Sequence, residues 1–363
     1  MAHETPSALI VTYLPSPYQV ELFNAIAASG RCKLSVIYLR KQESTPVASR
    51  WALPVITHEH WFADSPEFCE SVAVTRMMNA DLAVLNFYRH PVAAHLLDAR
   101  ARASKAWAFW GERPGVSGHG WFGKIARRFK LASLHRSRAP IWGIGAWAVA
   151  AWQAEFGFAR VYHDVPYFSD LNRFTIAVTQ RLRDVEGGKT RFLFSGSLIE
   201  RKGCDLIATA FSRLAKENAN VELHWAGNGP LEGVLRETLR GCAERVKFYG
   251  FVAWDALPAV YAEADVLLAP SRHDGWALVV PEGLAAGLPV ISTTKAGAAL
   301  ELIRHGENGW LIAPGDGEAL YRAMKQAVCR SPEMRNAAMQ SVDRHQLRDG
   351  VSRFNGAVAS ALL

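Results

Sequence analysis

The chain has 363 residues, half of them apolar, and a net charge of +7. That length predicts two domains, each large enough to bury its own core. No stretch approaches the roughly 20 uninterrupted apolar residues of a membrane span, and the first residues lack the charged-then-apolar pattern of a secretory signal. We therefore expect a soluble, cytoplasmic protein. Nucleic acid is not an expected partner, because neither a recognition-helix motif nor an aromatic RNA-binding signature accompanies the positive charge.

Cysteines and histidines show no disulfide or metal-binding pattern. An odd number of cysteines without a CxxC pair argues against a disulfide framework: Cys32, Cys69, Cys204, Cys242 and Cys329. We expect them to be buried thiols in a reducing compartment. The densest histidine cluster, His58-Glu59-His60, is expected to be a solvated loop. The sequence therefore predicts no metal site and no bound cofactor.

Short β-rich apolar runs alternate with helical stretches along the whole chain. In the first half the predicted strands are residues 8–14, 32–39, 81–87, 105–110, 139–145 and 161–167. The pattern restarts with residues 191–197, 221–226, 246–250, 266–271, 289–292 and 309–313. Apolar runs separated by helices indicate parallel strands joined by crossovers. The sequence thus predicts an α/β protein with two Rossmann-like, doubly wound sheets.

The two sets of strands define two predicted domains. Residues 1–168 form the N-terminal domain and residues 189–345 the C-terminal domain. Between them, residues 169–188 are polar, contain two adjacent glycines and are interpreted as the interdomain connection. The last segment, residues 346–363, has apolar residues at helical spacing and needs a surface on which to bury them. We expect this C-terminal helix to pack back on the N-terminal domain.

A basic segment in the first domain combines cations with an apolar stripe. Residues 121–138 contain no acidic residue and six cations: Lys124, Arg127, Arg128, Lys130, Arg136 and Arg138. Trp121, Ile125 and Phe129 recur at a four-residue step, which on a helix places them along one side. Such a helix suits an anionic bilayer surface, and it suits equally well an ordinary amphipathic helix that faces its own core.

Ligands of open α/β sheets bind beyond the carboxyl ends of the strands, so the residues that follow each strand are the candidate site. After strand 191–197, a short loop ends in Lys202 and Gly203 and opens a helix. A phosphate there would meet both helix amides and a fixed positive charge, so Lys202 is a candidate diphosphate ligand. After strand 221–226, the Gly-Asn-Gly-Pro run at 227–230 allows a tight turn close to a ligand.

Two carboxylates follow the strand 266–271. Asp274 is expected in a loop, and Glu282 in the first turns of a surface helix that Gly287 ends. Pro281 is tolerated there because the first amides of a helix have no intrahelical partner. A carboxylate beside a helix N-terminus can accept hydrogen bonds from two vicinal hydroxyls, which is how acidic residues commonly hold a ribose.

The order and spacing of these motifs resemble family 4 of the glycosyltransferases. The similarity covers residues 190–315 and rests on Gly196 through Gly203, Ala226-Gly227-Asn228-Gly229-Pro230, Phe248-Tyr249-Gly250, Pro270-Ser271-Arg272 and the run from Asp274 through Glu282 to Pro289-Val290. The first half also resembles the family at residues 13–18 and 110–112. The resemblance implies a GT-B fold, in which two Rossmann-like domains face each other across a cleft. It also implies retention of anomeric configuration and no required metal.

The resemblance further implies roles for individual residues. Lys202 would bind the diphosphate, Glu282 the nucleotide ribose and Asp274 hydroxyl groups of the donor sugar. Asp274, Lys202 and Glu112 are the catalytic candidates, with Glu112 near the reacting sugar. The wider donor site would comprise Gly196, Ser197, Arg201, Gly227, Asn228, Gly275, Trp276, Ala277 and Leu278. The predicted acceptor contacts are Ser16, Pro17 and Tyr18.

The chain departs from the family pattern in three places. The first carboxylate is usually Glu and is here Asp274, which is one methylene shorter. The family often has Arg five residues before the lysine, whereas this chain has Ser197, which leaves Arg201 or another cation to supply the second charge. Many members have a glycine pair after the first strand, where this chain has residues 15–18.

The sequence thus predicts a retaining, metal-independent hexosyltransferase. Its expected partners are a nucleotide-diphosphate sugar as donor, a glycan or lipid-linked acceptor and an anionic membrane surface at the inner face of the membrane. The alternatives are a nucleotide-sugar epimerase on the same fold and a non-catalytic module that binds sugar nucleotides. Hydrolase and NTPase functions are disfavoured, because GxSxG and Walker sequences are absent.

Overall fold

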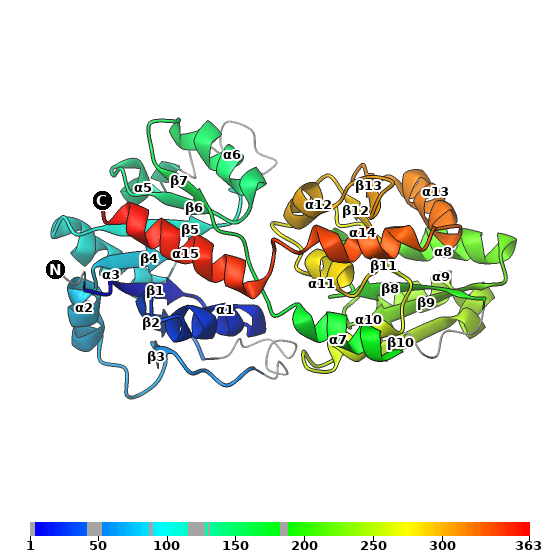
Figure 1. Cartoon of the computed structure of the whole chain (residues 1–363), viewed down its shortest axis with the longest axis horizontal. Coiled ribbons are helices and arrows are strands. Elements are labelled where there is room, and N and C mark those ends of the chain that lie inside the picture. Colours follow the sequence, from blue (N-terminus) through cyan, green and yellow to red (C-terminus); the bar gives the residue numbers. More distant parts are fainter. Residues whose placement is uncertain (1–3, 42–52, 87–89, 115–127, 130, 182–187) are drawn as a thin grey trace. The chain divides into compact units, whose positions relative to one another are not determined.

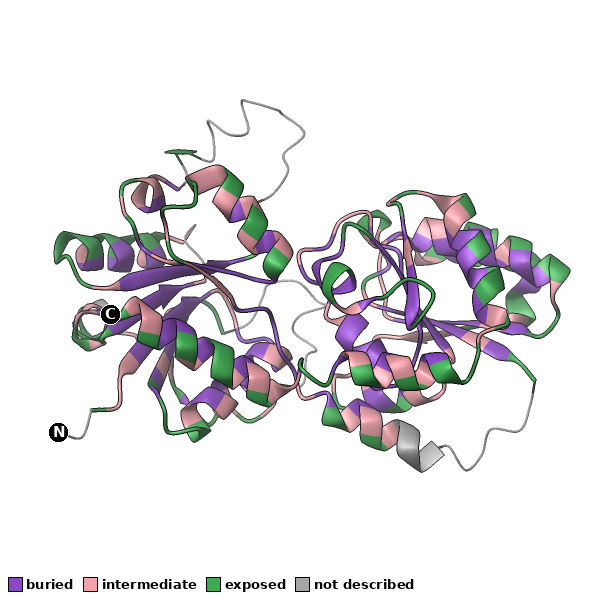
Figure 2. Cartoon of the chain, turned by 45° about the horizontal axis from the view of Figure 1, so that its top comes forward, coloured by how far each residue is buried: buried purple, intermediate pink, exposed green. Residues whose placement is uncertain are grey.

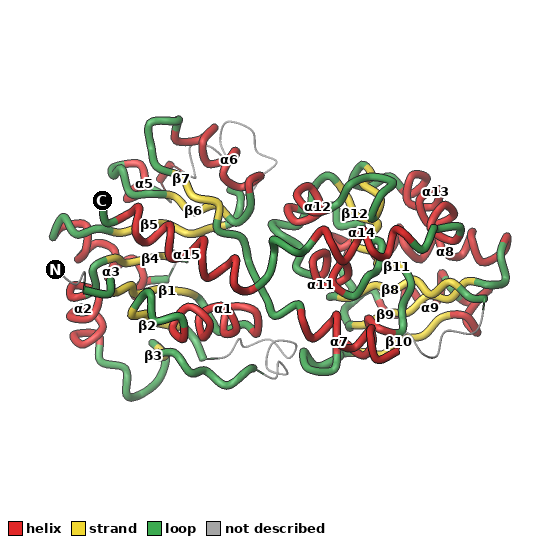
Figure 3. Tube along the Cα trace, viewed as in Figure 1, coloured by secondary structure: helices red, strands yellow, loops and turns green. Residues whose placement is uncertain are grey.

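The computed structural model describes residues 4–41, 53–86, 90–114, 128–129, 131–181 and 188–363. It divides into two compact units. Unit 1 comprises Met1–Ser169 and Leu347–Leu363, and unit 2 comprises Asp170–Gln346. Each unit is a parallel sheet with helices packed around it (Figures 1 and 3). The predicted α/β protein with two doubly wound sheets is confirmed.

Unit 1 contains a seven-stranded sheet in the order β3-β2-β1-β4-β5-β6-β7. Its strands all pair in parallel and are β1 (Ser7–Thr12), β2 (Lys33–Tyr38), β3 (Glu59–Phe62), β4 (Leu82–Leu85), β5 (Trp107–Gly111), β6 (Ile141–Gly143) and β7 (Tyr162–Asp164). The helices are α1 (Pro17–Ala28), α2 (Glu70–Asn79), α3 (Pro91–Arg102), α5 (Ala132–His135), α6 (Ala146–Phe156) and α15 (Leu347–Ala361). The strand order reverses between β1 and β4, so the switch point of this sheet lies at their carboxyl ends.

Unit 2 contains a six-stranded sheet in the order β10-β9-β8-β11-β12-β13. Its parallel strands are β8 (Thr190–Ser195), β9 (Val221–Ala226), β10 (Val246–Gly250), β11 (Val266–Ala269), β12 (Val290–Thr293) and β13 (Gly309–Ile312). The helices are α7 (Asn172–Arg181), α8 (Cys204–Glu217), α9 (Glu232–Thr238), α10 (Leu257–Ala262), α11 (Val279–Ala285), α12 (Gly297–Leu302), α13 (Gly317–Val328) and α14 (Glu333–Ser341), with 3-10 turns at Glu200–Lys202 and Arg240–Arg245. The switch point of this sheet lies between β8 and β11.

The central strands are buried on both faces. In β1, the four consecutive residues Ala8, Leu9, Ile10 and Val11 are all 0% exposed. Helices on the two sides of a parallel sheet remove both faces from water, which is why such strands appear in the sequence as continuous apolar runs. Figure 2 shows the same division, with buried strands inside each unit and helices whose outer faces are exposed.

The C-terminal helix belongs to unit 1, as predicted. α15 packs along α1 (Figure 1). Phe354 is 0% exposed, and its ring centroid lies 6.1 Å from that of Trp110 and 5.5 Å from that of Trp142. Arg353 also forms a 2.5 Å ion pair with Asp164 at the end of β7. The apolar stripe of the last segment therefore completes the core of the first unit.

The predicted solvated loop at His58-Glu59-His60 is wrong. Residues from Glu59 form the edge strand β3, and His58 is 3% exposed. His58 Nε2 lies 3.0 Å from the Tyr38 hydroxyl, and Nδ1 lies 2.7 Å from Asn24 Oδ1. Burial, followed by the charge of His60, lowers the pKa of His58 to about 4. This short strand mixes charged and aromatic residues, so it lacks the continuous apolar run by which the other strands were predicted.

The predicted burial of all five cysteines is correct only in part. Cys32, Cys204 and Cys242 are buried thiols, whereas Cys69 and Cys329 are exposed. Cys69 directly precedes α2, and Cys329 directly follows α13. Each exposed thiol therefore lies at a helix end, where the chain leaves the packed face.

The predicted connection at residues 169–188 contains a packed helix. α7 contacts α10 and α11 of unit 2. Phe174 is 0% exposed and packs on Tyr261, with ring centroids 5.0 Å apart. The Arg173 guanidinium lies 3.9 Å from the centroid of the Trp254 ring. Most of this segment is thus part of unit 2.

Candidate functional site

Three loops meet at the switch point of the unit 2 sheet, beyond the carboxyl ends of β8, β9 and β11. Gly227 has a φ of +141°, and a Cβ there would lie 1.9 Å from the carbonyl oxygen of Gly196. Gly203 has a φ of +76°, and a Cβ there would lie 2.4 Å from the carbonyl oxygen of Pro270. Only glycine satisfies both the conformation and the close approach. The glycines predicted for turning thus allow three loops to contact one another.

An ion pair joins the loop after β8 to the loop after β11. Lys202 Nζ lies 2.5 Å from Asp274 Oδ2, and Arg201 Nη1 lies 3.8 Å from the same oxygen. Arg201 also donates a 2.8 Å hydrogen bond to the carbonyl oxygen of His273. Asp274 is 9% exposed. Two cations and a carboxylate that lie far apart in the sequence therefore form one cluster.

Asp274 is fixed through its backbone. Its amide donates a 2.8 Å hydrogen bond to the carbonyl oxygen of Lys295, and a parallel bridge pairs it with Ala296. The adjacent Gly275 carbonyl oxygen lies 2.5 Å from the position that a Cβ on Gly297 would take. The carboxylate thus stands on a fixed loop, whereas Lys202 reaches it from a flexible four-carbon stem.

Residues 275–278 connect Asp274 to α11 in a strained conformation. Ala277 has a φ of +70°, a left-handed conformation that costs a non-glycine residue about 1–2 kcal/mol. Trp276 is 1% exposed, its ring lies 5.5 Å from that of His345, and its carbonyl oxygen accepts a 2.7 Å hydrogen bond from the Ala298 amide. Packing that maintains such strain is typical of ligand-binding loops.

Glu282 lies on α11, which is a buried helix and not the expected surface helix. Residues 280–285 are buried, and Glu282 is 8% exposed. Its Oε2 accepts a 3.2 Å hydrogen bond from the Tyr261 hydroxyl. Burial and the Glu282 charge raise the pKa of Tyr261 well above its usual value. The difference has a packing cause, because α7, α12 and α14 all contact α11.

The other predicted donor residues lie in the same loops. Gly196 directly follows β8, and Ser197 beside it is exposed. The Asn228 carbonyl oxygen accepts a 2.9 Å hydrogen bond from the Leu198 amide. Leu278 is half-buried and directly precedes α11. The structure therefore places the predicted donor residues at one edge of the unit 2 sheet.

Arg272 and Asp205 hold these loops together, and the sequence did not predict their contact. Arg272 Nη1 and Nη2 donate to the two Asp205 carboxylate oxygens at 2.8 and 2.7 Å. This bidentate bond and the charge of the guanidinium lower the pKa of Asp205. The Arg272 amide also donates a 2.8 Å hydrogen bond to the carbonyl oxygen of Arg201. The loop after β11 is thereby tied to the first turn of α8.

A second polar cluster lies at the switch point of the unit 1 sheet. Ser16 donates to Gln19 Oε1 at 2.9 Å, Gln19 donates to Thr12 Oγ1 at 3.3 Å, and Thr12 donates to Asn86 Oδ1 at 3.2 Å. Thr12 ends β1, and Asn86 directly follows β4. Pro17 occupies the first position of α1, where a missing amide removes no helical hydrogen bond.

Tyr18, Tyr167 and Glu112 lie at this unit 1 cluster. The ring centroids of Tyr18 and Tyr167 are 4.8 Å apart. Burial raises the pKa of Tyr18 to about 12, and the charge of Glu112 adds to the increase. Glu112 is exposed and directly follows β5. The sequence did not predict Asn86 or Tyr167 as site residues, although a polar side chain at the end of an apolar strand was the available signal.

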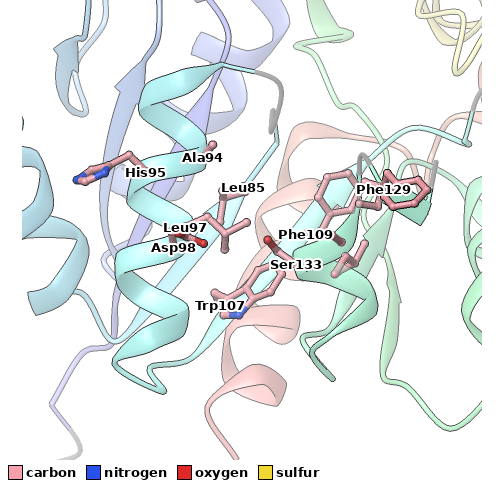
Figure 4. Close-up of a pocket in the computed structure, with 12 residues that line it drawn as sticks. Leu85, Ala94, His95, Leu97, Asp98, Trp107, Phe109, Phe129 and Ser133 are labelled. Carbon is pink, nitrogen blue, oxygen red and sulfur yellow. The ribbon is translucent and has the colours of Figure 1, made fainter. Parts of the chain in front are cut away.

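Unit 1 also holds an apolar pocket between α3 and α5 (Figure 4). Its volume is about 340 Å³. Buried side chains line its floor: Leu85, Trp107, Phe109, Leu131 and Leu134. Figure 4 shows Leu97 and Asp98 of α3 on one side and Phe129 on the other. Phe129 is 80% exposed, so the pocket has an apolar side chain at its rim.

The pocket adjoins the predicted basic segment. Residues 115–127 and 130 lie outside the described residues, and they include Trp121, Lys124, Ile125, Arg127 and Lys130. Arg128, Arg136 and Arg138 are described and exposed. No helix of the described segments is long and apolar enough to cross a membrane. Among those same residues, no three His, Cys, Asp or Glu side chains form a group that could hold a metal ion.

The segment that carries the unit 2 site matches a known family. Residues 189–329 match the family model for glycosyl transferases group 1. An uncharacterized glycosyltransferase of Methanocaldococcus jannaschii is 31% identical over 138 residues, 38% of this chain and 35% of that protein. The GDP-mannose-dependent alpha-(1-6)-phosphatidylinositol monomannoside mannosyltransferase of Mycobacterium tuberculosis is 29% identical over 216 residues, 56% of this chain and 55% of that protein. The chain thus spans between about a third and just over half the length of these curated relatives.

The fold of the whole chain is similar to that of solved proteins, which include a glycosyltransferase from Rickettsia africae with a TM-score of 0.74 at 12% identity, over 99% of both chains. Anabaena Alr3699/HepE, solved in complex with UDP, superposes with a TM-score of 0.76 at 16% identity, over 98% of this chain and 100% of that chain. Similarity at this identity shows the fold alone, and the expected GT-B fold is confirmed. The resemblance to GT-B glycosyltransferases is therefore confirmed, and residues 189–329, which carry Lys202, Asp274 and Glu282, match the model of the group 1 glycosyl transferases.

Proposed function

We propose that the chain is a retaining family 4 glycosyltransferase that moves a hexose from a nucleotide-diphosphate sugar to a glycan or lipid-linked acceptor. One observation carries the proposal. Lys202, Asp274 and Glu282 lie in the loop and helix segments at the switch point of unit 2, inside the segment that matches group 1 glycosyltransferases. A cation and two buried carboxylates suit a diphosphate and two sets of sugar hydroxyls.

In this proposal each donor residue meets one part of the nucleotide sugar. Lys202 binds the diphosphate, Glu282 accepts hydrogen bonds from the ribose, and Asp274 accepts them from the sugar that is transferred. Arg201 supplies the second cation that Ser197 does not, and its position 3.8 Å from Asp274 supports this role. The fixed backbone of Asp274 compensates for its shorter side chain, because the loop itself carries the carboxylate into the cluster.

The proposed reaction exchanges one bond at the anomeric carbon for another. The bond to the β-phosphate oxygen breaks, a bond to the acceptor hydroxyl oxygen forms, and the hydroxyl proton passes to the departing diphosphate. Negative charge develops on that departing oxygen, and preorganised cations stabilise it. Lys202 and Arg201 provide these cations without a metal ion in the proposed mechanism. Retention requires the acceptor hydroxyl to approach from the face that the diphosphate leaves.

The acceptor is proposed to bind at the polar cluster of unit 1. Ser16, Pro17 and Tyr18 open α1 at the switch point of that sheet, and Glu112 lies in the same electrostatic environment as Tyr18. Hydroxyl and amide side chains both donate and accept hydrogen bonds, which suits a sugar with the same capacity. Glu112 is placed near the reacting hydroxyl in this proposal, because its exposed carboxylate can accept a bond from it.

A lipid-linked acceptor is supported by the pocket between α3 and α5. Its volume of about 340 Å³ exceeds the roughly 150 Å³ apolar cavity that is known to hold benzene. We assign it to the hydrocarbon chain of an anionic lipid, because the exposed Arg128 directly precedes the rim residue Phe129 and suits a negative headgroup. The name of the M. tuberculosis relative includes phosphatidylinositol monomannoside, a glycolipid. The protein would thus act in the cytoplasm at the inner face of the membrane.

The donor assignment is tested by a thermal-shift panel of UDP, GDP, ADP and their sugars. A ligand that binds only the folded state raises its melting temperature, and we expect one base to do so. Transfer of the matching sugar to glycan and lipid acceptors in EDTA then tests the enzyme, and NMR of the product tests retention. Interconversion of the donor sugar without an acceptor would favour an epimerase. Tight binding without any turnover would favour a binding module, and no binding at all would contradict the donor site.

A further inference from the structure

The Lys202–Asp274 ion pair places a carboxylate beside the cation to which we assign the diphosphate. We infer that Asp274 is a selectivity residue that weakens binding of the sugar-free nucleotide diphosphate and so favours the intact nucleotide sugar. This inference rests on the proposed function, because it takes Lys202 as the diphosphate ligand. It adds discrimination between substrate and product to the role of Asp274 as a sugar contact.

The geometry brings the carboxylate and an incoming phosphate close together. Lys202 Nζ lies 2.5 Å from Asp274 Oδ2, and an ammonium group has two further N–H donors for a second anion. A phosphate oxygen bound to that nitrogen at a usual distance of about 2.8 Å would lie within about 5 Å of the carboxylate oxygen. The side chains are only 21% and 13% exposed, so water and salt screen their charges less than at an open surface. The two anions therefore repel each other.

The backbone of Asp274 is held in place, so the loop cannot carry the carboxylate away from the phosphate. Its amide donates a hydrogen bond to the Lys295 carbonyl oxygen, a parallel bridge pairs it with Ala296, and the next residue is packed against Gly297. Lys202 can shift toward a diphosphate because its charge lies at the end of a flexible stem. Binding of the diphosphate then weakens the Lys202 ion pair and leaves the Asp274 carboxylate with Arg201, 3.8 Å away, in place of its hydrogen-bonded cation.

The transferred sugar offsets the repulsion between Asp274 and the diphosphate. An ionised carboxylate only accepts hydrogen bonds, and a diphosphate that is ionised at neutral pH offers it no donor. Sugar hydroxyls do offer donors, so an intact nucleotide sugar replaces the Lys202 bond with hydroxyl bonds to Asp274. After transfer the sugar is gone, and the carboxylate again faces the diphosphate alone. The same residue thus favours loading of the donor and release of the product.

The experiment compares two dissociation constants by calorimetry. The probes are UDP with UDP-glucose and GDP with GDP-mannose, and the pair that binds the wild-type protein is used. In Asp274→Asn we expect the nucleotide diphosphate to bind about tenfold more tightly, which corresponds to roughly 1.4 kcal/mol. The nucleotide sugar should gain little or lose affinity, so the ratio of the two constants should fall toward one. Asp274→Ser removes the same charge with a smaller side chain and serves if the amide variant does not fold.

Glu200→Gln is the matched control. It removes one negative charge two residues before Lys202, and Glu200 is exposed and in no ion pair among the described residues. We expect it to change both constants slightly and equally. An unchanged diphosphate affinity in Asp274→Asn, or an equal gain for both ligands, overturns the inference. Failure of the wild-type protein to bind any nucleotide or nucleotide sugar of the thermal-shift panel would instead contradict the proposed function, so the two failures are distinct.

Discussion

The position of Lys202 in the fold determines what its charge can bind. It follows β8, lies in a loop held by Gly203 against Pro270, and is paired with Asp274. In the proposed reaction it stabilises the departing diphosphate.

Lys202→Ala should therefore lower kcat by about two orders of magnitude, the usual effect of removing one charged group that stabilises a developing anion. Steady-state kinetics measure this, with the exposed Lys216→Ala on α8 as control. Turnover within a few-fold of wild type at unchanged stability would remove Lys202 from this role.

Glu282 is buried and bonded to Tyr261, so its replacement has to separate folding from function. Glu282→Gln retains an oxygen that accepts from the Tyr261 hydroxyl, and we expect the free energy of unfolding to change by no more than about 1 kcal/mol. Donor affinity should fall at least tenfold, because a neutral amide binds two ribose hydroxyls less well than a carboxylate. Calorimetry and thermal melting measure the two effects. Tyr261→Phe is the control, since it removes the hydrogen bond to Glu282 but keeps the carboxylate. Normal donor affinity in Glu282→Gln would exclude the ribose role.

The sequence revealed the charged residues of the donor site but not their partners. Lys202, Asp274 and Glu282 were predicted because each follows an apolar strand in a recognisable order. Tyr261 was not, since it lies on α10, and its contact with Glu282 depends on how two helices pack. The Arg272–Asp205 bond was missed for the same reason, because 67 residues separate its partners. Motif order therefore predicts which residues carry charge, and only the fold determines what each one contacts.

At the scale of elements, the buried His58 directly before β3 predicts how the stability of the protein depends on pH. Asn24 Oδ1 accepts from His58 Nδ1 and Tyr38 donates to Nε2, an arrangement that suits the neutral ring. Burial lowers the pKa of His58 to about 4, below the unfolded value near 6.5. Between these values the unfolded chain binds the extra proton, so stability falls as the pH decreases from about 6.5 to 4. The loss from this group amounts to about 3 kcal/mol at most.

Urea titrations at several pH values check this prediction. His58→Gln should be less stable than wild type at pH 7, and its free energy of unfolding should depend less on pH between about 6.5 and 4. His305→Gln replaces an exposed histidine of unit 2 and serves as control. Equal pH dependence in wild type and His58→Gln would show that the ring is not buried in its neutral form.

The same scale shows which elements the sequence could predict. Strands such as β1 and β11 are buried on both faces, and the sequence predicted them from their apolar runs. α11 was recognised as a helix, but its burial was not, although Glu282 is its one charged residue. α11 is buried because α7, α12 and α14 pack around it. Helix identity is a local property, whereas burial is a property of the assembled unit.

At the scale of the whole molecule, residues Leu347–Leu363 belong to unit 1 together with the N-terminal half of the chain. α15 contributes Phe354 to the core of unit 1 and pairs Arg353 with Asp164. The polar cluster, the apolar pocket and the described cations of the basic segment all belong to this unit. If the acceptor is lipid-linked, as proposed, unit 1 therefore contains the residues that would contact both the acceptor and the membrane.

Liposome flotation tests whether unit 1 binds a membrane. Each cation near an anionic leaflet contributes about 1 kcal/mol, which salt screens, so binding should rise with anionic lipid and fall with ionic strength. Replacing four cations of the basic segment by Gln should weaken binding: Lys124, Arg127, Arg128 and Lys130. Replacing four exposed cations of unit 2 by Gln should not: Lys216, Arg304, Arg322 and Lys325.

The pocket is tested by Phe129→Ser, which should also weaken binding, because Phe129 is 80% exposed at the pocket. Phe158→Ser is the matched control, because Phe158 is 82% exposed. If the wild-type protein stays in the soluble fraction with acidic liposomes at low salt, the membrane proposal fails and a soluble acceptor follows. If both phenylalanine variants weaken binding equally, the membrane contact does not depend on the pocket.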